Sequence, residues 1–301
     1  MPDVRPQARV RTRHRTAAVA LVAVTAVLMG RTAHSATTSQ PPAGFIAHAF
    51  GSPPTGETYT NSLEAFRESY SNGFRVFEVD MVRLKDGRIA LAHDRFETRY
   101  GLPAGTRFSQ VTSAQMTGRK LDGQWPVLLG SQFLHLVKNH PDAKFVLDTK
   151  GDDVEIAAWF VKYMAPSSLA RVFPHVYSQA HLNGLKQLYR WPGYVVATYR
   201  WAVEKKEQKT VELVSRNNLQ TVMIRPHEIS PTFETRVRAA GARHLFVHSL
   251  TAEADILAWR AKGWGVYSNG WIGSVPTVPI ETTPPTEEPM ATASGGGTTE
   301  I

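Results

Sequence analysis

The chain has 301 residues, no cysteine and a formal net charge of +8 at pH 7. The lack of cysteine excludes disulfides, thiol nucleophiles, iron–sulfur clusters and Cys-based zinc sites. With 42% hydrophobic and 20% charged residues, the chain is long enough to bury one large core. Six arginines and one acid before residue 44 supply five of the positive charges, leaving +3 for the remainder. We therefore expect no nucleic-acid partner.

The first 36 residues have the pattern of a secretory signal peptide. An arginine-rich head, "RVRTRHR", precedes an apolar stretch over 17–30 and small residues near Ser35 and Ala36. The apolar stretch is shorter than the roughly 20 residues of a membrane-spanning helix. The sequence therefore predicts a secreted or extracytoplasmic protein with a linker over 37–43. Because Arg31 lies close to the cleavage region, an uncleaved N-terminal anchor is the alternative.

Apolar, strand-like runs alternate with amphipathic helical stretches over 44–273. Helical patterns follow Asn61 and cover 154–164, 230–242 and 254–263, the last two ending at glycine or just beyond it. The tail, 274–301, is rich in Pro, Thr and Gly and is expected to be disordered. The strand-like runs are 45–50, 74–81, 88–94, 143–150, 171–177, 194–200, 221–226, 244–250 and 265–271.

This alternation predicts a parallel sheet covered by helices. Over roughly 230 residues, we expect a single-domain α/β fold, the (β/α)8 TIM-type barrel, spanning 44–273. A doubly wound open sheet is the alternative. That fold normally carries a glycine-rich phosphate loop after its first strand, and "AHAFGSPPTG" fits this pattern poorly.

Polar side chains interrupt the apolar runs where predicted strands end. In a barrel, active groups lie at the carboxyl ends of the strands. Side chains two apart on a strand share a face, so Glu78 and Asp80 point the same way. A divalent cation would relieve their repulsion, with Asp148 as a third carboxylate ligand. Oxygen donors favour Mg²⁺ or Ca²⁺. The complete set of strand-end groups is His48, Glu78, Asp80, His93, Asp148 and Lys150.

His48 and His93 are not needed as metal ligands in this scheme. Two histidines beside a cation suit acid–base catalysis near neutral pH, one taking a proton and the other giving one. The sequence leaves open which is the base. Lys150 is placed to face a substrate anion. His175, His227 and His248 also lie near strand ends, and we expect structural or substrate-lining roles for them.

The segment 47–94 resembles the opening of the glycerophosphodiester phosphodiesterase family, a group of phospholipase-C-like phosphodiesterase barrels. His48 resembles the first histidine of its His-Arg-Gly motif, and Asn61-Ser62 its Asn-Thr pair. "EVD" at 78–80 resembles its Glu-x-Asp metal pair, and "DG" at 86–87 is followed by "HD" at 93–94 as in the family. "FVLDTK" and "GVYSNG" resemble its Glu-x-Lys strand and its closing Tyr-Thr-Asp region.

The resemblance implies a metal-dependent phosphodiesterase that cleaves glycerophosphodiester or phospholipid-type bonds with two histidines. It also implies that Asn61 belongs to the substrate-binding set, although Asn61 and Glu64 have the spacing of a helix capping box as well. Ala49 stands where the family has Arg, and Thr60 where it has Glu. Lys150 or Arg225, in "MIRPH", is the candidate for the missing phosphate contact.

Three alternatives to this function stay open. Asp148 in place of the family's Glu makes "DTK" similar to the sphingomyelinase D group, which implies a phospholipase of that kind. A barrel that binds phosphodiester head groups without cleaving them is the second alternative. A glycosidase is disfavoured, because its two carboxylates lie on different strands across the sugar. As partners we expect a small-molecule or lipid phosphodiester, peripheral contact with a membrane or cell wall, and no second subunit.

Overall fold

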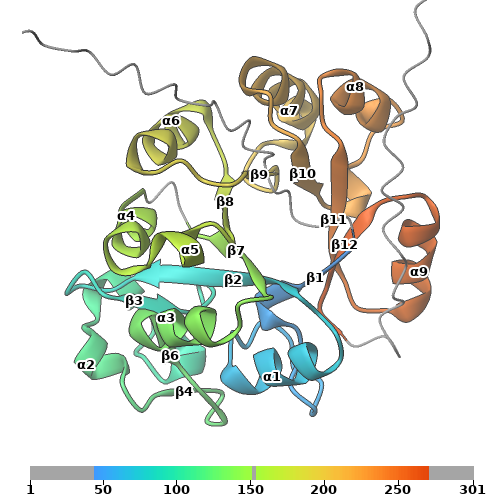
Figure 1. Ribbon diagram of the computed structural model, residues 1–301. Coiled ribbons are helices and arrows are strands. Elements are labelled where there is room, and N and C mark those ends of the chain that lie inside the picture. Colours follow the sequence, from blue (N-terminus) through green and yellow to red (C-terminus); the bar gives the residue numbers. More distant parts are fainter. Residues whose placement is uncertain (1–43, 151–153, 271–301) are drawn as a thin grey trace, which may run out of the picture. The chain divides into compact units, whose positions relative to one another are not determined.

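The computed structural model describes residues 44–150 and 154–270, and eight parallel strands form a closed barrel at its centre (Figure 1). Each strand pairs in parallel with its neighbours, and β1 pairs with both β12 and β2, which closes the ring. The predicted TIM-type barrel is therefore confirmed. Its strands are β1 (Phe45–Ala47), β2 (Val76–Arg83), β7 (Lys144–Asp148), β8 (Val172–Val176), β9 (Val195–Ala197), β10 (Thr221–Ile224), β11 (His244–Leu250) and β12 (Gly265–Ser268).

Helices on the outside of the barrel link consecutive strands (Figure 1). No helix in the described ranges is long and apolar enough to cross a membrane. The predicted signal peptide, linker and C-terminal tail lie outside the described residues. The helices are α1 (Leu63–Ser71), α2 (Ser113–Met116), α3 (Gly130–Asn139), α4 (Val154–Tyr163), α5 (Pro166–Leu169), α6 (Gln179–Leu188), α7 (Val203–Asn217), α8 (Phe233–Ala239) and α9 (Glu253–Ala261).

Strand β2 is buried on both faces, because helices cover its outer face and the barrel interior covers its inner face. Phe77, Val79 and Met81 join the hydrophobic layer between the strands and the helices. Val76 instead packs in a second cluster with residues from β1, β7 and other barrel strands, such as Ile46 and Val146. Because side chains alternate in direction, Glu78 and Asp80 follow Val76 on the inner face, toward the carboxyl end.

The strand predicted over 88–94 is not a barrel strand. β3 (Ile89–Leu91) runs antiparallel to β2 and forms a hairpin with it, in which Arg83 is opposite Ile89. Asp86-Gly87 supplies the turn, and Gly87 has a φ of 74°. The hairpin begins an insertion that ends before α3 and also contains β4 (Lys120–Leu121), β5 (Trp125–Pro126), β6 (Leu128–Leu129) and the 3₁₀ turns Glu97–Tyr100 and Phe108–Gln110.

Ser62, not Asn61, caps helix α1. The Ser62 hydroxyl accepts a hydrogen bond of 3.1 Å from the Ala65 backbone N–H. Asn61 has a φ of 48° and directs its amide group toward Asp80. The capping-box prediction for Asn61 and Glu64 was therefore wrong, and the shift of one residue frees the Asn61 side chain for the barrel mouth.

Candidate active site

Three carboxylates converge inside the carboxyl end of the barrel. Asp80 on β2 is opposite Asp148 on β7 in the parallel register, and Glu78 lies two residues earlier on β2. Each residue offers a carboxylate oxygen, and these oxygens all lie within 4.8 Å of one another. All three residues are buried. The structure thus brings the predicted acidic set together.

Glu78 is the least compensated member of the acidic cluster. Burial, together with the negative charges of Asp80 and Asp148, raises the pKa of Glu78 well above its ordinary value. Its Oε2 accepts a 2.7 Å hydrogen bond from the backbone N–H of Ala49. Its buried Oε1 has no hydrogen-bond partner in the described part of the chain. This oxygen is therefore available to a cation.

Lys150 lies between the two aspartates. Its ammonium nitrogen is 2.5 Å from Asp80 Oδ1 and also pairs with Asp148 Oδ2. Burial alone would raise the pKa of both aspartates, but the Lys150 charge reverses this effect and lowers both pKa values. Lys150 therefore forms ion pairs with two acids of the cluster. The sequence instead predicted a contact between Lys150 and a substrate anion.

Two tyrosines complete the surroundings of Asp148. The Tyr199 hydroxyl donates to its carboxylate at 2.8–2.9 Å, and the Tyr177 hydroxyl donates to Oδ1. Buried acids at this density need positive charge, which Lys150 supplies only in part. Three carboxylates with an unpartnered oxygen form a hard donor set that fits a divalent metal ion.

His48 follows β1 directly and is buried beside the acids. Its Nδ1 is 2.5 Å from Asn269 Oδ1. Its Nε2 is 3.7 Å from Glu78 Oε2. Burial lowers the pKa of His48 to about 4, so its imidazole is neutral at neutral pH. Asn269 Nδ2 faces the hydroxyls of Ser249 and Thr251, each at 3.1 Å, which orients its oxygen toward His48. Nδ1 of His48 therefore carries the proton, and Nε2 keeps its lone pair.

The Tyr59 ring contacts both His48 and His93. The Tyr59 ring centroid is 4.6 Å from that of His48 and 5.4 Å from that of His93. His93 follows β3, and the β2–β3 hairpin brings it back to the level of Asp80, whose backbone oxygen accepts from the Ala92 N–H. His93 is partly exposed, and its Nδ1 faces the backbone oxygen and carboxylate of Asp94.

Asn61 contacts the acidic cluster, whereas Arg225 lies beside Glu228 and Tyr199. Asn61 makes two 2.9 Å hydrogen bonds with Asp80, donating to Oδ2 and accepting from the backbone N–H. It thereby fixes the orientation of a carboxylate. Arg225 follows β10 and is partly exposed. Its Nη1 lies 3.7 Å from Glu228 Oε1. Its guanidinium is 5.9 Å from the centre of the Tyr199 ring.

The other strand-end histidines separate into one exposed and two site-facing residues. His227 is 75% exposed on its side chain. His175 is buried, with Nε2 3.2 Å from the Tyr267 hydroxyl. His248 Nε2 lies 2.9 Å from His48 Nε2. The sequence did not single out His248 or Asn269 as partners of His48; their positions at the ends of β11 and β12 were the available signal.

Comparison with known proteins gives a family and a fold. Residues 51–228, more than half of the chain, match the sequence profile of the glycerophosphoryl diester phosphodiesterase family. The matched segment contains the three clustered acids, Lys150 and His93, whereas His48 and Asn269 lie outside it. No curated protein has a significant sequence match to the chain.

Solved structures with similar folds come from several organisms. The structure of an Oleispira antarctica phosphodiesterase in complex with the product sn-glycerol-3-phosphate is 19% identical, with a TM-score of 0.58, covering 78% of this chain and 95% of that one. A glycerophosphodiester phosphodiesterase from Parabacteroides distasonis has 14% identity, a TM-score of 0.58 and coverage of 75% and 92%. One from Thermotoga maritima has 17% identity, a TM-score of 0.55 and coverage of 76% and 96%.

At these identities the structural likeness supports the fold, and the family follows from the profile match. The matched segment contains all three acids that cluster at the carboxyl end of the barrel. The chain belongs to the glycerophosphoryl diester phosphodiesterase family, whose members are hydrolases that act on phosphodiester bonds.

Proposed function

We propose that this protein is an exported, divalent-metal-dependent phosphodiesterase that cleaves glycerophosphodiesters by acid–base catalysis with His48 and His93. The convergence of Glu78, Asp80 and Asp148 at the barrel mouth carries this proposal, because a divalent cation would offset the negative charge that Lys150 compensates only in part. A bound Mg²⁺ or Ca²⁺ would stabilise the negative charge of the phosphoryl oxygens.

His48 is proposed as the general base. It is neutral, and its Nδ1–H is held by Asn269, so the lone pair on Nε2 is available to take a proton. In the structure this lone pair accepts a hydrogen bond from the Nε2–H of His248, at an N–N distance of 2.9 Å. The attacking hydroxyl, of water or of the substrate's own neighbouring alcohol, would replace His248 as the hydrogen-bond donor.

His93 is proposed as the general acid. Its side chain is more accessible than that of His48, with 24% exposed against 2%, so it can regain a proton from solvent. Its Nδ1 faces the Asp94 carboxylate at 3.2 Å. Nε2 would then donate a proton to the leaving alcohol. Lys150, Asn61 and Arg225 are proposed as the phosphate-facing and orienting groups of the site.

A kinetic comparison of histidine variants tests these assignments. His48→Ala and His93→Ala are each expected to lower kcat on glycerophosphodiesters by at least about 100-fold. His135→Ala, which removes an exposed histidine from α3, is the matched control and should retain full activity. Near-complete activity of either site variant would remove that histidine from the mechanism. Ligand-induced stabilisation without release of an alcohol would instead indicate a barrel that only binds its ligand.

Export is proposed from the arginine-rich head, the apolar stretch over 17–30 and the small residues that follow. Cell fractionation of the tagged protein, with N-terminal sequencing of the exported form, tests this. An N-terminus near residue 36 is expected for cleavage, and an intact N-terminus for the anchor. A charge placed in the apolar stretch, as in Val22→Asp, should retain the protein in the cytoplasm. We also propose that the protein acts as a monomer, which its sedimentation coefficient tests.

A further inference from the structure

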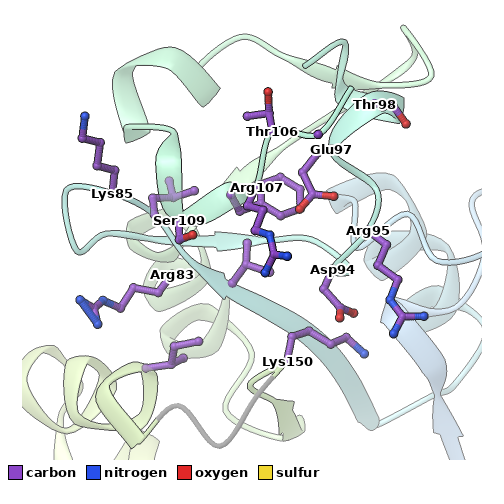
Figure 2. Close-up of a pocket in the computed structure, with 15 residues that line it drawn as sticks. Arg83, Lys85, Asp94, Arg95, Glu97, Thr98, Thr106, Arg107, Ser109 and Lys150 are labelled. Atoms are coloured by element: carbon purple, nitrogen blue, oxygen red, sulfur yellow. The ribbon is translucent and has the colours of Figure 1, made fainter. Parts of the chain in front are cut away.

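A cavity of about 910 Å³ adjoins the cluster of acids. It is lined by the last residues of β2, by the segment 94–98, by the loop 105–109 and by Lys150 (Figure 2). Pockets of roughly 300–1,000 Å³ hold whole small molecules and not merely a single ion. The insertion after β2 therefore helps to form a cavity with room for a substantial part of a substrate.

Two residues connect this cavity to the proposed chemistry. Lys150 lines it, and the Lys150 ammonium lies 2.5 Å from Asp80 Oδ1 in the acidic cluster. Asp94 also lines it and faces the ring of His93. A phosphodiester bound at the acids would therefore have one of its two alcohols directed toward the cavity.

Positive charge predominates among the described residues that line the cavity. The lining includes the cations Arg83, Lys85, Arg95, Arg107 and Lys150, against the acids Asp94 and Glu97. Two of these cations have acidic partners, since Lys150 pairs with the aspartates of the cluster and Arg83 pairs with Glu155. The excess charge therefore rests on the other three.

Arg107 is the unpaired cation best placed to meet a ligand, and Arg95 is an unpaired cation at the edge of the cavity. Within the described ranges, neither side chain makes a hydrogen bond or ion pair, whereas nearby Arg99 is paired with Asp122. In Figure 2 the Arg107 guanidinium extends into the middle of the cavity toward Asp94 and Lys150, while the Lys85 side chain points away. Guanidinium groups bind phosphate oxygens with two parallel hydrogen bonds.

We propose that this cavity is a second anion subsite, which selects phosphodiesters carrying a further phosphate on one of the two esterified alcohols. Arg107 binds that distal phosphate while the phosphodiester lies at the acids, and Arg95 adds positive charge to the same cavity lining. This inference rests on the proposed function for its substrate, but the subsite can be tested without turnover.

Binding of two matched ligands tests the subsite directly. Hexane-1,6-diol bisphosphate and hexyl phosphate differ by one phosphate and contain no phosphodiester. Calorimetric titration, with Mg²⁺ present, is expected to show that the bisphosphate binds about tenfold more tightly, because hydrogen bonds to charged groups contribute at least this factor. The preference should decrease as NaCl is raised, because solvent-exposed charges are screened.

Arginine variants locate the second phosphate. Arg107→Ala should reduce the preference by about fivefold, Arg95→Ala should reduce it by less, and Arg107→Lys should retain part of it. Binding of hexyl phosphate should not change, which shows that the variants are folded. Arg190→Ala removes an exposed arginine from the loop between α6 and β9, at the opposite end of the barrel, and is the matched control.

Equal affinity for the two ligands in the unaltered protein, or a preference that survives both arginine-to-alanine changes, would overturn the subsite. Turnover is measured separately, on the glycerophosphodiesters of hexanol and of 6-phosphohexanol. A bisphosphate preference without turnover of either diester would support the subsite and refute the proposed function. Turnover of both diesters with equal kcat/KM, together with equal ligand affinities, would support the function and refute the subsite.

Discussion

Asp80 and Asp148 lie opposite each other in the register of β2 and β7, and the Lys150 ammonium contacts both carboxylates. Like charges in a buried site are costly unless a counter-charge is present. Lys150 partly fulfils this role, and the cation of the proposed function would add to it.

Lys150→Met is expected to destabilise the metal-free protein by about 3 kcal/mol, because it leaves buried carboxylates without their partner. Thermal unfolding in EDTA should show a lower Tm for the variant. Addition of Mg²⁺ or Ca²⁺ should raise that Tm more than it raises the Tm of the unaltered protein. Lys138→Met, on the exposed surface of α3, should behave like the unaltered protein. An unchanged Tm of Lys150→Met in EDTA would show that the ammonium does not stabilise the cluster.

Metal binding should release a proton from Glu78. Burial and the neighbouring aspartates raise the Glu78 pKa well above 4.5, so the metal-free carboxyl is protonated up to that raised pKa. A cation requires the carboxylate, and metal affinity should therefore increase as pH rises through this range. Calorimetric titration in two buffers of different ionisation enthalpy measures the released proton. Glu78→Gln should abolish the proton release. A metal affinity that does not change with pH would contradict a protonated Glu78 in the metal-free protein.

The same group sets a pH dependence of stability. The folded, metal-free protein binds a proton at Glu78 that the unfolded chain loses above its lower, ordinary pKa. This contribution to stability is complete below the unfolded pKa and is lost as pH rises through the folded pKa. In EDTA, Tm should thus decrease with rising pH more steeply for the unaltered protein than for Glu78→Gln. Parallel curves for the two proteins would rule out a titrating Glu78.

Asn61 is expected to act through Asp80. Its two hydrogen bonds fix the Asp80 carboxylate, and loss of such support typically lowers metal affinity by about 10–100-fold. Asn61→Ala should show this weakening in a Mg²⁺ titration while excess Mg²⁺ restores much of kcat. Asn139→Ala, at the exposed end of α3, provides the control. If Asn61→Ala raised only KM, with the metal affinity intact, Asn61 would be a substrate ligand.

Asn269 is expected to fix the tautomer of His48. Asn269→Leu removes the acceptor for Nδ1–H and should lower kcat by about 10–100-fold with little change in KM. Asn269→Asp restores an acceptor and adds a negative charge, which raises the pKa of His48. Because the base must be neutral, the acid limb of the pH–rate profile should move to higher pH. An acid limb that stays in place would contradict the assignment of His48 as the base.

Much of the barrel was predictable because parallel strands buried on both faces read as apolar runs. The run over 88–94 was misassigned to the barrel because an apolar run does not reveal strand direction. The Asp86-Gly87 pair was the local signal for the antiparallel hairpin. The consequence for the site was small, since the hairpin still returns His93 to the barrel mouth.

The acids were predictable from period-two alternation and position, whereas their partners were not. Thr60, Asn61 and Ser62 are all residue types that can cap a helix, and only the structure shows which one does. His248 and Asn269 reach His48 through barrel closure, across more than 190 residues of sequence. Such contacts depend on the register of distant strands, for which a single sequence offers no local signal.

Hydrolysis of glycerophosphodiesters by the purified protein, with and without a chelator, is the decisive test of a metal centre at Glu78, Asp80 and Asp148. We expect alcohol release that EDTA abolishes and that Mg²⁺ or Ca²⁺ restores. Asp148→Asn should prevent this restoration at ordinary metal concentrations, and Asp255→Asn, on the exposed surface of α9, should not. Full activity in EDTA, or in Asp148→Asn, would contradict a metal centre at these three carboxylates.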